Sequence, residues 1–139
     1  MSEYKNQFVS YNIAKELYNK GFNEPCLGNY GCENAWMIDI AEGSFNLVEH
    51  TNSPNREYTV SAQTWEQARV WIEEKHNLFI TVIPMLVSAG TTSGHRFTFF
   101  ILNLNDYNET SDESPLGFLT YNEAREKAFL TAIELCVKK

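Results

Sequence analysis

The sequence predicts an α+β fold: a mainly antiparallel sheet of about four strands with three helices packed on it, in the order α-β-β-α-β-β-α. The first observation is a pair of helix-start signatures, Thr64-Trp65-Glu66-Gln67 and Thr120-Tyr121-Asn122-Glu123. In each, a threonine can cap a helix while the residue three places on reaches back to the cap's own N–H. The second is strand-like sequence before and between these helices, with short links typical of antiparallel hairpins. With 139 residues, we expect a single domain over residues 1–139.

Composition limits the class of protein. The chain is 43% hydrophobic and 14% aromatic, which is typical of a globular protein. No apolar stretch reaches the roughly 18 residues that span a bilayer, and the N-terminal MSEYKNQFVS lacks the apolar core of a signal peptide. Three cysteines, an odd number, suit a reducing compartment. We therefore expect a cytoplasmic protein that does not bind membranes.

The first predicted helix runs from about Tyr11 to Lys20. Ser10 is its expected N-cap, and Gly21 is expected to stop it in the left-handed conformation. Phe22 lies where a Schellman motif places an apolar residue that folds back on Leu17. This segment therefore has both a start and a stop signal.

Two strands are predicted next, Trp36 to Ile40 and Phe45 to His50, joined by a short link as in a hairpin. The connection before them, with Pro25 and Gly28, is expected to be turn-rich. Arg56 to Val60 reads as a further short edge strand.

The second predicted helix covers about Trp65 to His76, with Trp65, Ala68 and Ile72 as its apolar stripe and Asn77 as a left-handed stop.

Two long apolar runs follow this helix. Leu78 to Val87 and His95 to Leu104 suit central strands covered on both faces. Pro84 lacks a ladder N–H and should lie at an edge or bulge. Ser88–Gly94 is predicted to be a glycine-rich hairpin loop, because it lacks the lysine and the following helix of a phosphate-binding P-loop.

The C-terminal part is predicted as an acidic loop followed by a helix. Asn105 to Pro115 is polar and is expected to be the most mobile loop. The third helix should run from about Tyr121 to Val137. Its expected apolar side consists of Tyr121, Ala124, Ala128, Ala132 and Leu135, flanked by Phe129 and Ile133. Arg125 falls within this apolar arc, where it can extend to the edge of the arc or pair with a carboxylate.

The net charge of −7 disfavours direct binding to nucleic acid, whose phosphates attract basic surfaces. An acidic protein can instead mimic nucleic acid and inhibit a DNA-binding protein, which is one alternative function.

No metal site is predicted. Cys26 and Cys32 with His50 are the candidate ligands, but the spacing CLGNYGC exceeds the gap of two to four residues typical of zinc ligands, and no second pair follows. Buried thiols explain the cysteines better. The acidic loop lacks the alternating ligands of a calcium site, and we expect no cofactor.

No catalytic residue is assigned either. Cys26 follows a proline beside Glu24, without the cation or helix N-terminus that activates a thiol, and neither His50 nor His95 lies in a catalytic signature. Three carboxylates, Asp39, Glu42 and Glu49, can lie close together on paired strands, but outward positions explain them as well. A small cysteine- or carboxylate-dependent hydrolase is thus an alternative, not the preferred prediction.

Val70 and Trp71 lie outside the apolar stripe of the second helix and are the candidate interaction surface. Together with an exposed strand edge, they suggest a homodimer with Trp71 as a contact residue. The net charge opposes such self-association.

Three segments carry a resemblance: VSYNIAKELYNKGFNEPC (Val9 to Cys26), TWEQARVWIEEKHNLFITVIP (Thr64 to Pro84) and TYNEAREKAFLTAIELC (Thr120 to Cys136). Together they resemble a family of small uncharacterised proteins carried by prophages and other mobile elements of Bacteroides-type bacteria, and more loosely the phage α-β-α sandwich domain. The resemblance implies a bacterial or phage cytosolic setting and an accessory role, and it assigns no catalytic residues. The preferred prediction is a non-enzymatic binding or accessory protein with an unspecified protein partner.

Overall fold

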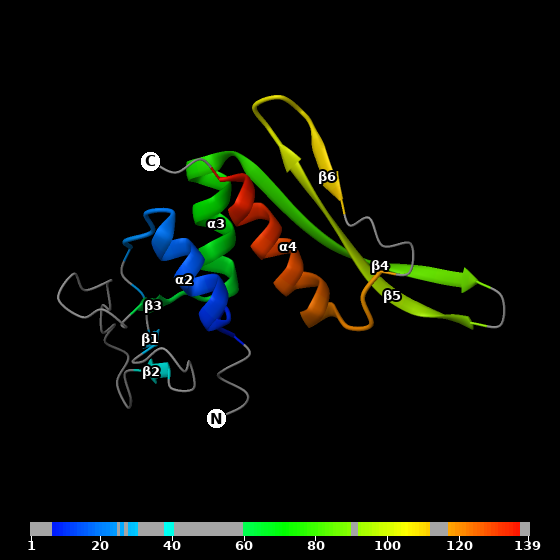
Figure 1. Ribbon diagram of the computed structural model, residues 1–139, viewed down its shortest axis with the longest axis horizontal. Helices are drawn as coiled ribbons and strands as arrows, with labels where there is room; N and C mark the ends of the chain where they lie inside the picture. The colour runs from blue at the N-terminus through cyan, green and yellow to red at the C-terminus, as the bar shows by residue number, and fades with distance from the viewer. Residues whose placement is uncertain are drawn as a thin grey trace. The chain divides into compact units, whose positions relative to one another are not determined.

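The computed structural model describes residues 7–24, 26, 28–30, 38–40, 60–89, 92–111 and 117–136. In these ranges the fold is α+β with antiparallel strands, as predicted, and the chain forms two compact units, residues 1–71 with 137–139 and residues 72–136. The prediction of a single domain over residues 1–139 stays a prediction. The elements, shown in Figure 1, are α2 (Tyr11–Asn19), β1 (Gly28–Tyr30), β2 (Ile38–Ile40), β3 (Val60–Ala62), α3 (Trp65–His76), β4 (Leu78–Ala89), β5 (Thr92–Asn103), β6 (Glu109–Ser111) and α4 (Tyr121–Leu135).

The predicted sheet of about four strands is matched only in part: the described strands pair antiparallel, as predicted, but they form two three-stranded sheets, β2-β1-β3 and β4-β5-β6. Two short strands were missed. β1 lies in the connection expected to be turn-rich, and β6 lies in the acidic loop. A strand of three residues is too short to show an alternating pattern, so pairing with neighbours, not local sequence, defines it.

The N-terminal unit contains the sheet β2-β1-β3, with Gly28 opposite both Ile40 and Ala62. Tyr30 is buried on β1, and its hydroxyl donates a hydrogen bond to the backbone carbonyl of Val9. The predicted strands are confirmed only at Ile38–Ile40 and Val60. The remainder of these predictions, including Trp36, Phe45 to His50 and the first part of Arg56 to Val60, lies outside the described residues.

Helix α2 has the ends that the sequence predicts. The Ser10 hydroxyl accepts a hydrogen bond from the Ile13 N–H at 3.3 Å. Gly21 has φ +100°, and the Phe22 N–H donates to the Leu17 carbonyl at 3.0 Å. This is the Schellman pairing, in which a left-handed residue turns the chain back onto the last helical turn.

Helix α3 begins and ends at the predicted residues. Its cap is Thr64, whose hydroxyl accepts from the Gln67 N–H at 3.1 Å, and Asn77 stops it at φ +57°. Helix α4 begins at Tyr121 as predicted, with the Thr120 hydroxyl accepting from the Glu123 N–H at 3.1 Å, and ends at Leu135 instead of Val137.

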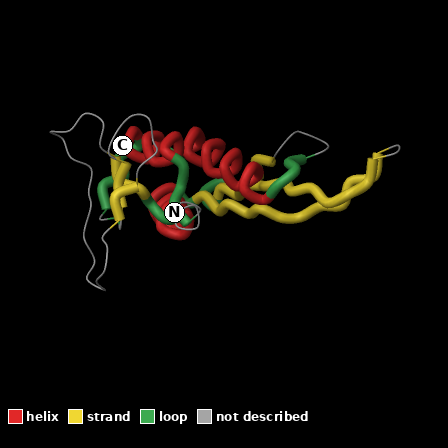
Figure 2. Tube along the Cα trace, turned by 90° about the horizontal axis from the view of Figure 1, so that it is seen from below, coloured by secondary structure: helices red, strands yellow, loops and turns green. Residues whose placement is uncertain are grey.

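In the C-terminal unit, β4 and β5 pair along their whole length, from Leu78 opposite Asn103 to Ala89 opposite Thr92. Both strands extend into the predicted Ser88–Gly94 loop, β4 to Ala89 and β5 from Thr92. β6 pairs with the other edge of β5, and α4 packs on β4 and β5. Figure 2 shows α4 along one side of this sheet.

The buried side of α4 is formed by Ala124, Ala128, Phe129, Ala132 and Ile133. Tyr121 and Leu135, predicted to share this side, are exposed at the two ends of the helix. No helix among the described residues is long and apolar enough to cross a membrane.

Candidate functional site

The C-terminal sheet has one covered and one open face. Residues directly opposite each other on neighbouring strands share a face, so the register assigns every side chain. Leu78, Phe99 and Ile101 are buried on the face that α4 covers. On the other face, Phe79 and Ile83 are each 37% exposed. No described helix of this unit lies over that face (Figure 2).

We call this second surface the open face. It consists of the alternate residues Phe79, Thr81, Ile83 and Met85 of β4, Arg96, Thr98, Phe100 and Leu102 of β5, and Glu109 and Ser111 of β6. The prediction that both long strands are central and covered on both faces is therefore wrong for β4 in the described part of this unit. Among the described elements of this unit, a helix covers only the α4 side, and β4 is an edge strand instead of a central one.

The backbone of β4 has a free edge interrupted by a proline. The N–H and C=O of Phe97 both pair with Phe118, each at 2.8 Å, on the side of β5 away from β4. Phe97 therefore makes no ladder bonds to its opposite residue, Pro84, and the ring nitrogen of Pro84 points to the free edge of β4. This confirms the predicted edge position of Pro84, where its missing N–H interrupts strand addition.

Beyond Pro84 and Phe97 the sheet narrows to a two-stranded arm. Met85–Ala89 and Thr92–Arg96 pair with each other, and among the described residues no third strand pairs with them. Leu86 in this arm is 79% exposed. An isolated two-stranded ribbon is marginally stable in water, so the arm depends on the sheet at its base.

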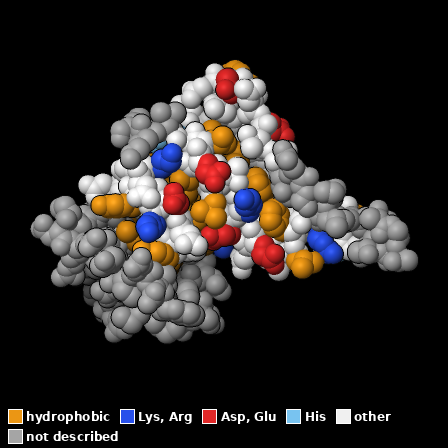
Figure 3. All heavy atoms as spheres, in the orientation of Figure 1, with side chains coloured by type: hydrophobic (Ala, Val, Ile, Leu, Met, Phe, Trp, Pro, Cys, Tyr) orange, Lys and Arg blue, Asp and Glu red, His pale blue; other side chains and the backbone are white. Residues whose placement is uncertain are grey.

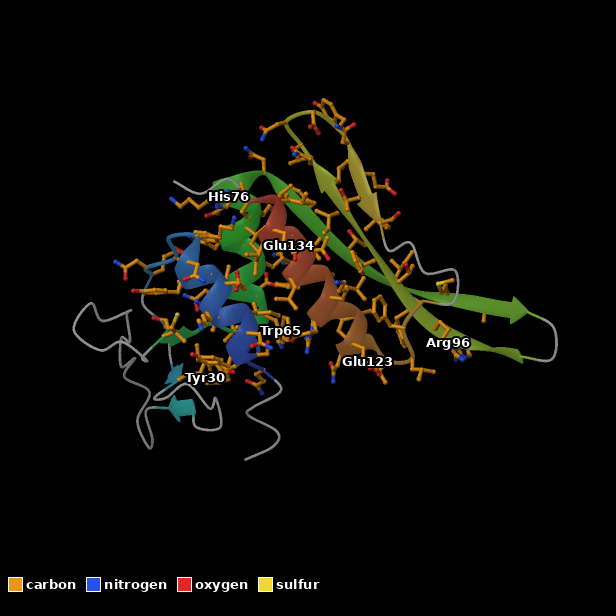
Figure 4. The ribbon with its side chains drawn as sticks, in the orientation of Figure 1. Tyr30, Trp65, His76, Arg96, Glu123 and Glu134 are labelled. Carbon is orange, nitrogen blue, oxygen red and sulfur yellow. The ribbon has the colours of Figure 1, made fainter. Side chains whose placement is uncertain are left out.

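Opposite charges mark the two ends of the open face. Arg96 lies on β5 at the base of the arm, as Figure 4 shows, and its guanidinium donates to the His95 carbonyl at 3.1 Å. Glu109 lies on β6 opposite Leu102, six residues further along β5. Neither residue belongs to the ion pair between Arg69 and Glu66 in the described part of the chain. The central residues between them are uncharged.

Cys26 is buried in the N-terminal unit. Its thiol donates to the Glu24 carbonyl at 3.5 Å. Burial raises the pKa of this thiol to about 11, and the negative charge of Glu24 adds to the increase, whereas hydrogen bonds with Ser61 and Gln67 partly oppose it. A nucleophilic cysteine needs the opposite shift. Gln63, from the same chain segment as Ser61, is fully buried, with no hydrogen-bond partner for its side-chain amide in the described ranges.

The other candidate ligands and catalytic groups are not brought together in the described residues. His95 is exposed on β5 opposite Leu86, in the unit that lacks Cys26. Cys32, His50, Glu42 and Glu49 lie outside the described residues. No group of three or more His, Cys, Asp or Glu side chains suited to a metal ion occurs in the ranges given above.

Trp71 is buried, with 6% of its surface exposed and its ring edge-on to Phe22 at a centroid distance of 5.4 Å. Val70 is half-buried. This placement gives no support to a contact role for either residue, and the open face is a surface that sequence reasoning missed. The signal for it was present: β4 and β5 are apolar on both of their sides, more than one covering helix requires.

Arg125 is half-buried on α4, as its position in the apolar arc predicts. Its guanidinium carbon lies 5.2 Å from the centre of the Tyr121 ring, and it donates to the Asn122 side chain at 3.1 Å. Burial lowers the pKa of Arg125, and the aromatic ring favours its charged form. A structural role accounts for these contacts.

Figure 3 shows acidic and basic side chains interspersed with apolar ones on the visible face. An array of carboxylates at phosphate-like spacing, which nucleic-acid mimicry requires, is not seen among the described residues on that face.

Comparisons with models of known protein families, with curated protein sequences and with solved structures find no match. The resemblance to the prophage and mobile-element family therefore stays a prediction.

Proposed function

We propose that this protein is a non-catalytic protein-binding module and that the open face is its binding surface. The observation that supports this most directly is the exposure of Phe79 and Ile83 on the edge strand β4, on the sheet face that no described helix of the same unit covers. Contiguous exposed apolar surface on a folded domain is typical of a protein–protein contact. An accessory role in a phage or mobile element rests on the family resemblance alone.

The alternatives predicted from the sequence have weaker support. A cysteine-dependent hydrolase would use Cys26, but its raised pKa leaves the thiol protonated near neutral pH. A nucleic-acid mimic would need a one-signed surface, whereas the face in Figure 3 carries both signs. Of the carboxylates that a carboxylate-dependent enzyme would use, Glu42 and Glu49 lie outside the described residues.

Site-specific photo-crosslinking tests the proposal. We would place the photoreactive amino acid p-benzoylphenylalanine at position 79 and irradiate cells that express the protein. The matched control is position 121, an exposed aromatic residue on α4, which packs on the opposite face of the same sheet. We expect a discrete protein adduct from position 79 that is absent from position 121.

An adduct identified by mass spectrometry and lost on introducing Ile83→Asp would support the open face as the binding surface. The absence of any protein adduct at position 79, or an adduct unaffected by Ile83→Asp, would overturn the proposal. Circular dichroism and unfolding of the Ile83→Asp variant check that the loss is not due to misfolding.

A further inference from the structure

We infer that the partner of the open face is a second copy of this chain, packed face to face about a two-fold axis that lies across the strands. This inference rests on the proposed function, because it assigns an occupant to the same surface. Its support is the distribution of charge on the face, which is complementary to itself.

The face has a positive end and a negative end. Arg96 and Leu102, the residue opposite Glu109, are separated by six positions along β5, which is about 20 Å in a strand. Thr98 and Phe100 lie between them, and the neighbouring part of β4 carries Phe79, Thr81 and Ile83, none of them charged. A second copy rotated by 180° about the axis across the strands therefore places Arg96 next to Glu109 of its partner twice, with uncharged side chains between the two pairs.

The same charges disfavour the other two-fold arrangement. An axis parallel to the strands and passing over β5 would place Arg96 against Arg96 of the second copy, and like charges juxtaposed across an interface oppose binding. The axis across the strands, near the position between Thr98 and Phe100, is the one that pairs opposite charges. Two sheets stacked in this way pack about 10 Å apart.

Edge-to-edge pairing of β4 is a less favourable way to associate. Pro84 lacks the N–H that would bond across the free edge, and its ring projects there. Packing through the open face, by contrast, requires no hydrogen bonds from the backbone groups at the edge of β4. The proline therefore makes association through the β4 edge less favourable than packing through the open face.

The size of the face limits the strength of the dimer. Two strands of about seven residues and one short strand, spaced about 4.8 Å apart, cover roughly 300 Å² per copy. Stable interfaces bury about 800 Å² per partner, and the net charge of −7 on each copy adds repulsion. We therefore expect a weak dimer whose population rises with concentration.

Sedimentation equilibrium of the full chain at several concentrations measures this dimer, and charge reversal tests its geometry. Arg96→Glu and Glu109→Arg should each weaken dimerisation about tenfold, because each places like charges together twice. The double variant Arg96→Glu/Glu109→Arg should restore the wild-type dissociation constant. Glu109→Arg is decisive, because it changes the net charge from −7 to −5 and would strengthen the dimer if only net charge mattered.

The matched control is Glu134→Arg, which makes the same change in net charge on an exposed position of α4. It should leave the dimer unchanged or strengthen it. A wild-type chain that stays monomeric up to millimolar concentration, or a Glu109→Arg variant that dimerises as well as Glu134→Arg, would overturn the inference.

The crosslinking experiment separates the inference from the proposed function. An adduct at position 79 with the mass of two copies supports both. An adduct with a different protein overturns the inference and leaves the proposed function standing, and the absence of an adduct overturns both.

Discussion

At the scale of single residues, the Cys26 thiol has the most strongly shifted pKa that we describe. Its pKa is raised from 9.0 to about 11, chiefly because burial disfavours the thiolate. We expect iodoacetamide to alkylate Cys26 at pH 8 about a hundredfold more slowly than an unfolded thiol, since two pKa units reduce the thiolate fraction by that factor. The measurement uses a variant that keeps Cys26 as its single cysteine. Equal rates in native and urea-unfolded protein would contradict the assignment.

The same shift has a defined effect on stability. Because the folded pKa lies above the unfolded value, the native state retains a proton that the unfolded state has lost between pH 9 and 11. The contribution of the thiol is fully present below about pH 9 and is lost as the pH rises through 11. We therefore expect the difference in free energy of unfolding between wild type and Cys26→Ala to shrink over this window, measured by urea titration. A difference that is constant from pH 8 to 11 would be inconsistent with the raised pKa.

Two glycines with positive φ offer a matched comparison. Gly117 has φ +66°, and a Cβ there would lie 2.6 Å from the Phe97 carbonyl oxygen. Gly21 has φ +100° with nothing within 4 Å of its Cβ position. Gly21→Ala should cost roughly 1–2 kcal/mol through its backbone conformation alone, and Gly117→Ala about 1 kcal/mol more, because the pairing of Phe97 with Phe118 must also shift. Chemical denaturation of both variants gives the comparison, and equal losses would be the contrary result.

At the scale of elements, the backbone N–H and C=O groups of the edge strand β4 point in opposite directions at alternate residues. Even-numbered residues, such as Val82 and Pro84, direct their backbone groups to the free edge, and odd-numbered residues bond to β5. Thr81→Pro should therefore lower the free energy of unfolding by about 1–3 kcal/mol more than Val82→Pro, since only the former removes a ladder bond and leaves a β5 carbonyl without its donor. Urea unfolding measures this, and a greater loss for Val82→Pro would show that the register is wrong.

The helix ends were predictable because they depend on neighbours in the chain. Ser10, Thr64 and Thr120 each accept a hydrogen bond from the N–H three residues on, and Gly21 and Asn77 adopt the left-handed conformation. These interactions close within a few residues. The strands are different: β1 pairs with β3, which lies far away in the chain, and β6 is defined by its pairing with the preceding strand β5 and not by a pattern of its own.

At the scale of the whole molecule, we expect folding to be independent of metal ions. No candidate ligand cluster occurs in the described ranges, and the Cys26–Cys32 spacing in the sequence is unlike that of zinc ligands. Adding a chelator such as EDTA should leave the thermal unfolding midpoint unchanged, with a zinc-finger protein as the positive control. A fall of several degrees would show that a metal site has been overlooked.

The candidate site was only partly predictable from the sequence. The apolar character of β4 and β5 on both sides could be read directly, as could the edge position of Pro84. The sequence prediction placed the contact surface at Trp71, because Trp71 lies outside the helical stripe. The structure packs that ring against Phe22, which lies far away in the chain. A stripe identifies the side of a helix that is buried, but it does not identify the segments that cover its remaining sides.

The sequence by itself determined the α+β class, the boundaries of α3, the ends of α2 and the start of α4, because capping and left-handed stops are local. It also determined the net charge that disfavours contact with nucleic acid. Only the tertiary structure decided the grouping of strands into two sheets, the burial of Trp71 and Cys26, and which face of the β4-β5-β6 sheet stays open. These depend on contacts between residues distant in the chain, and such contacts are set by packing rather than by local sequence.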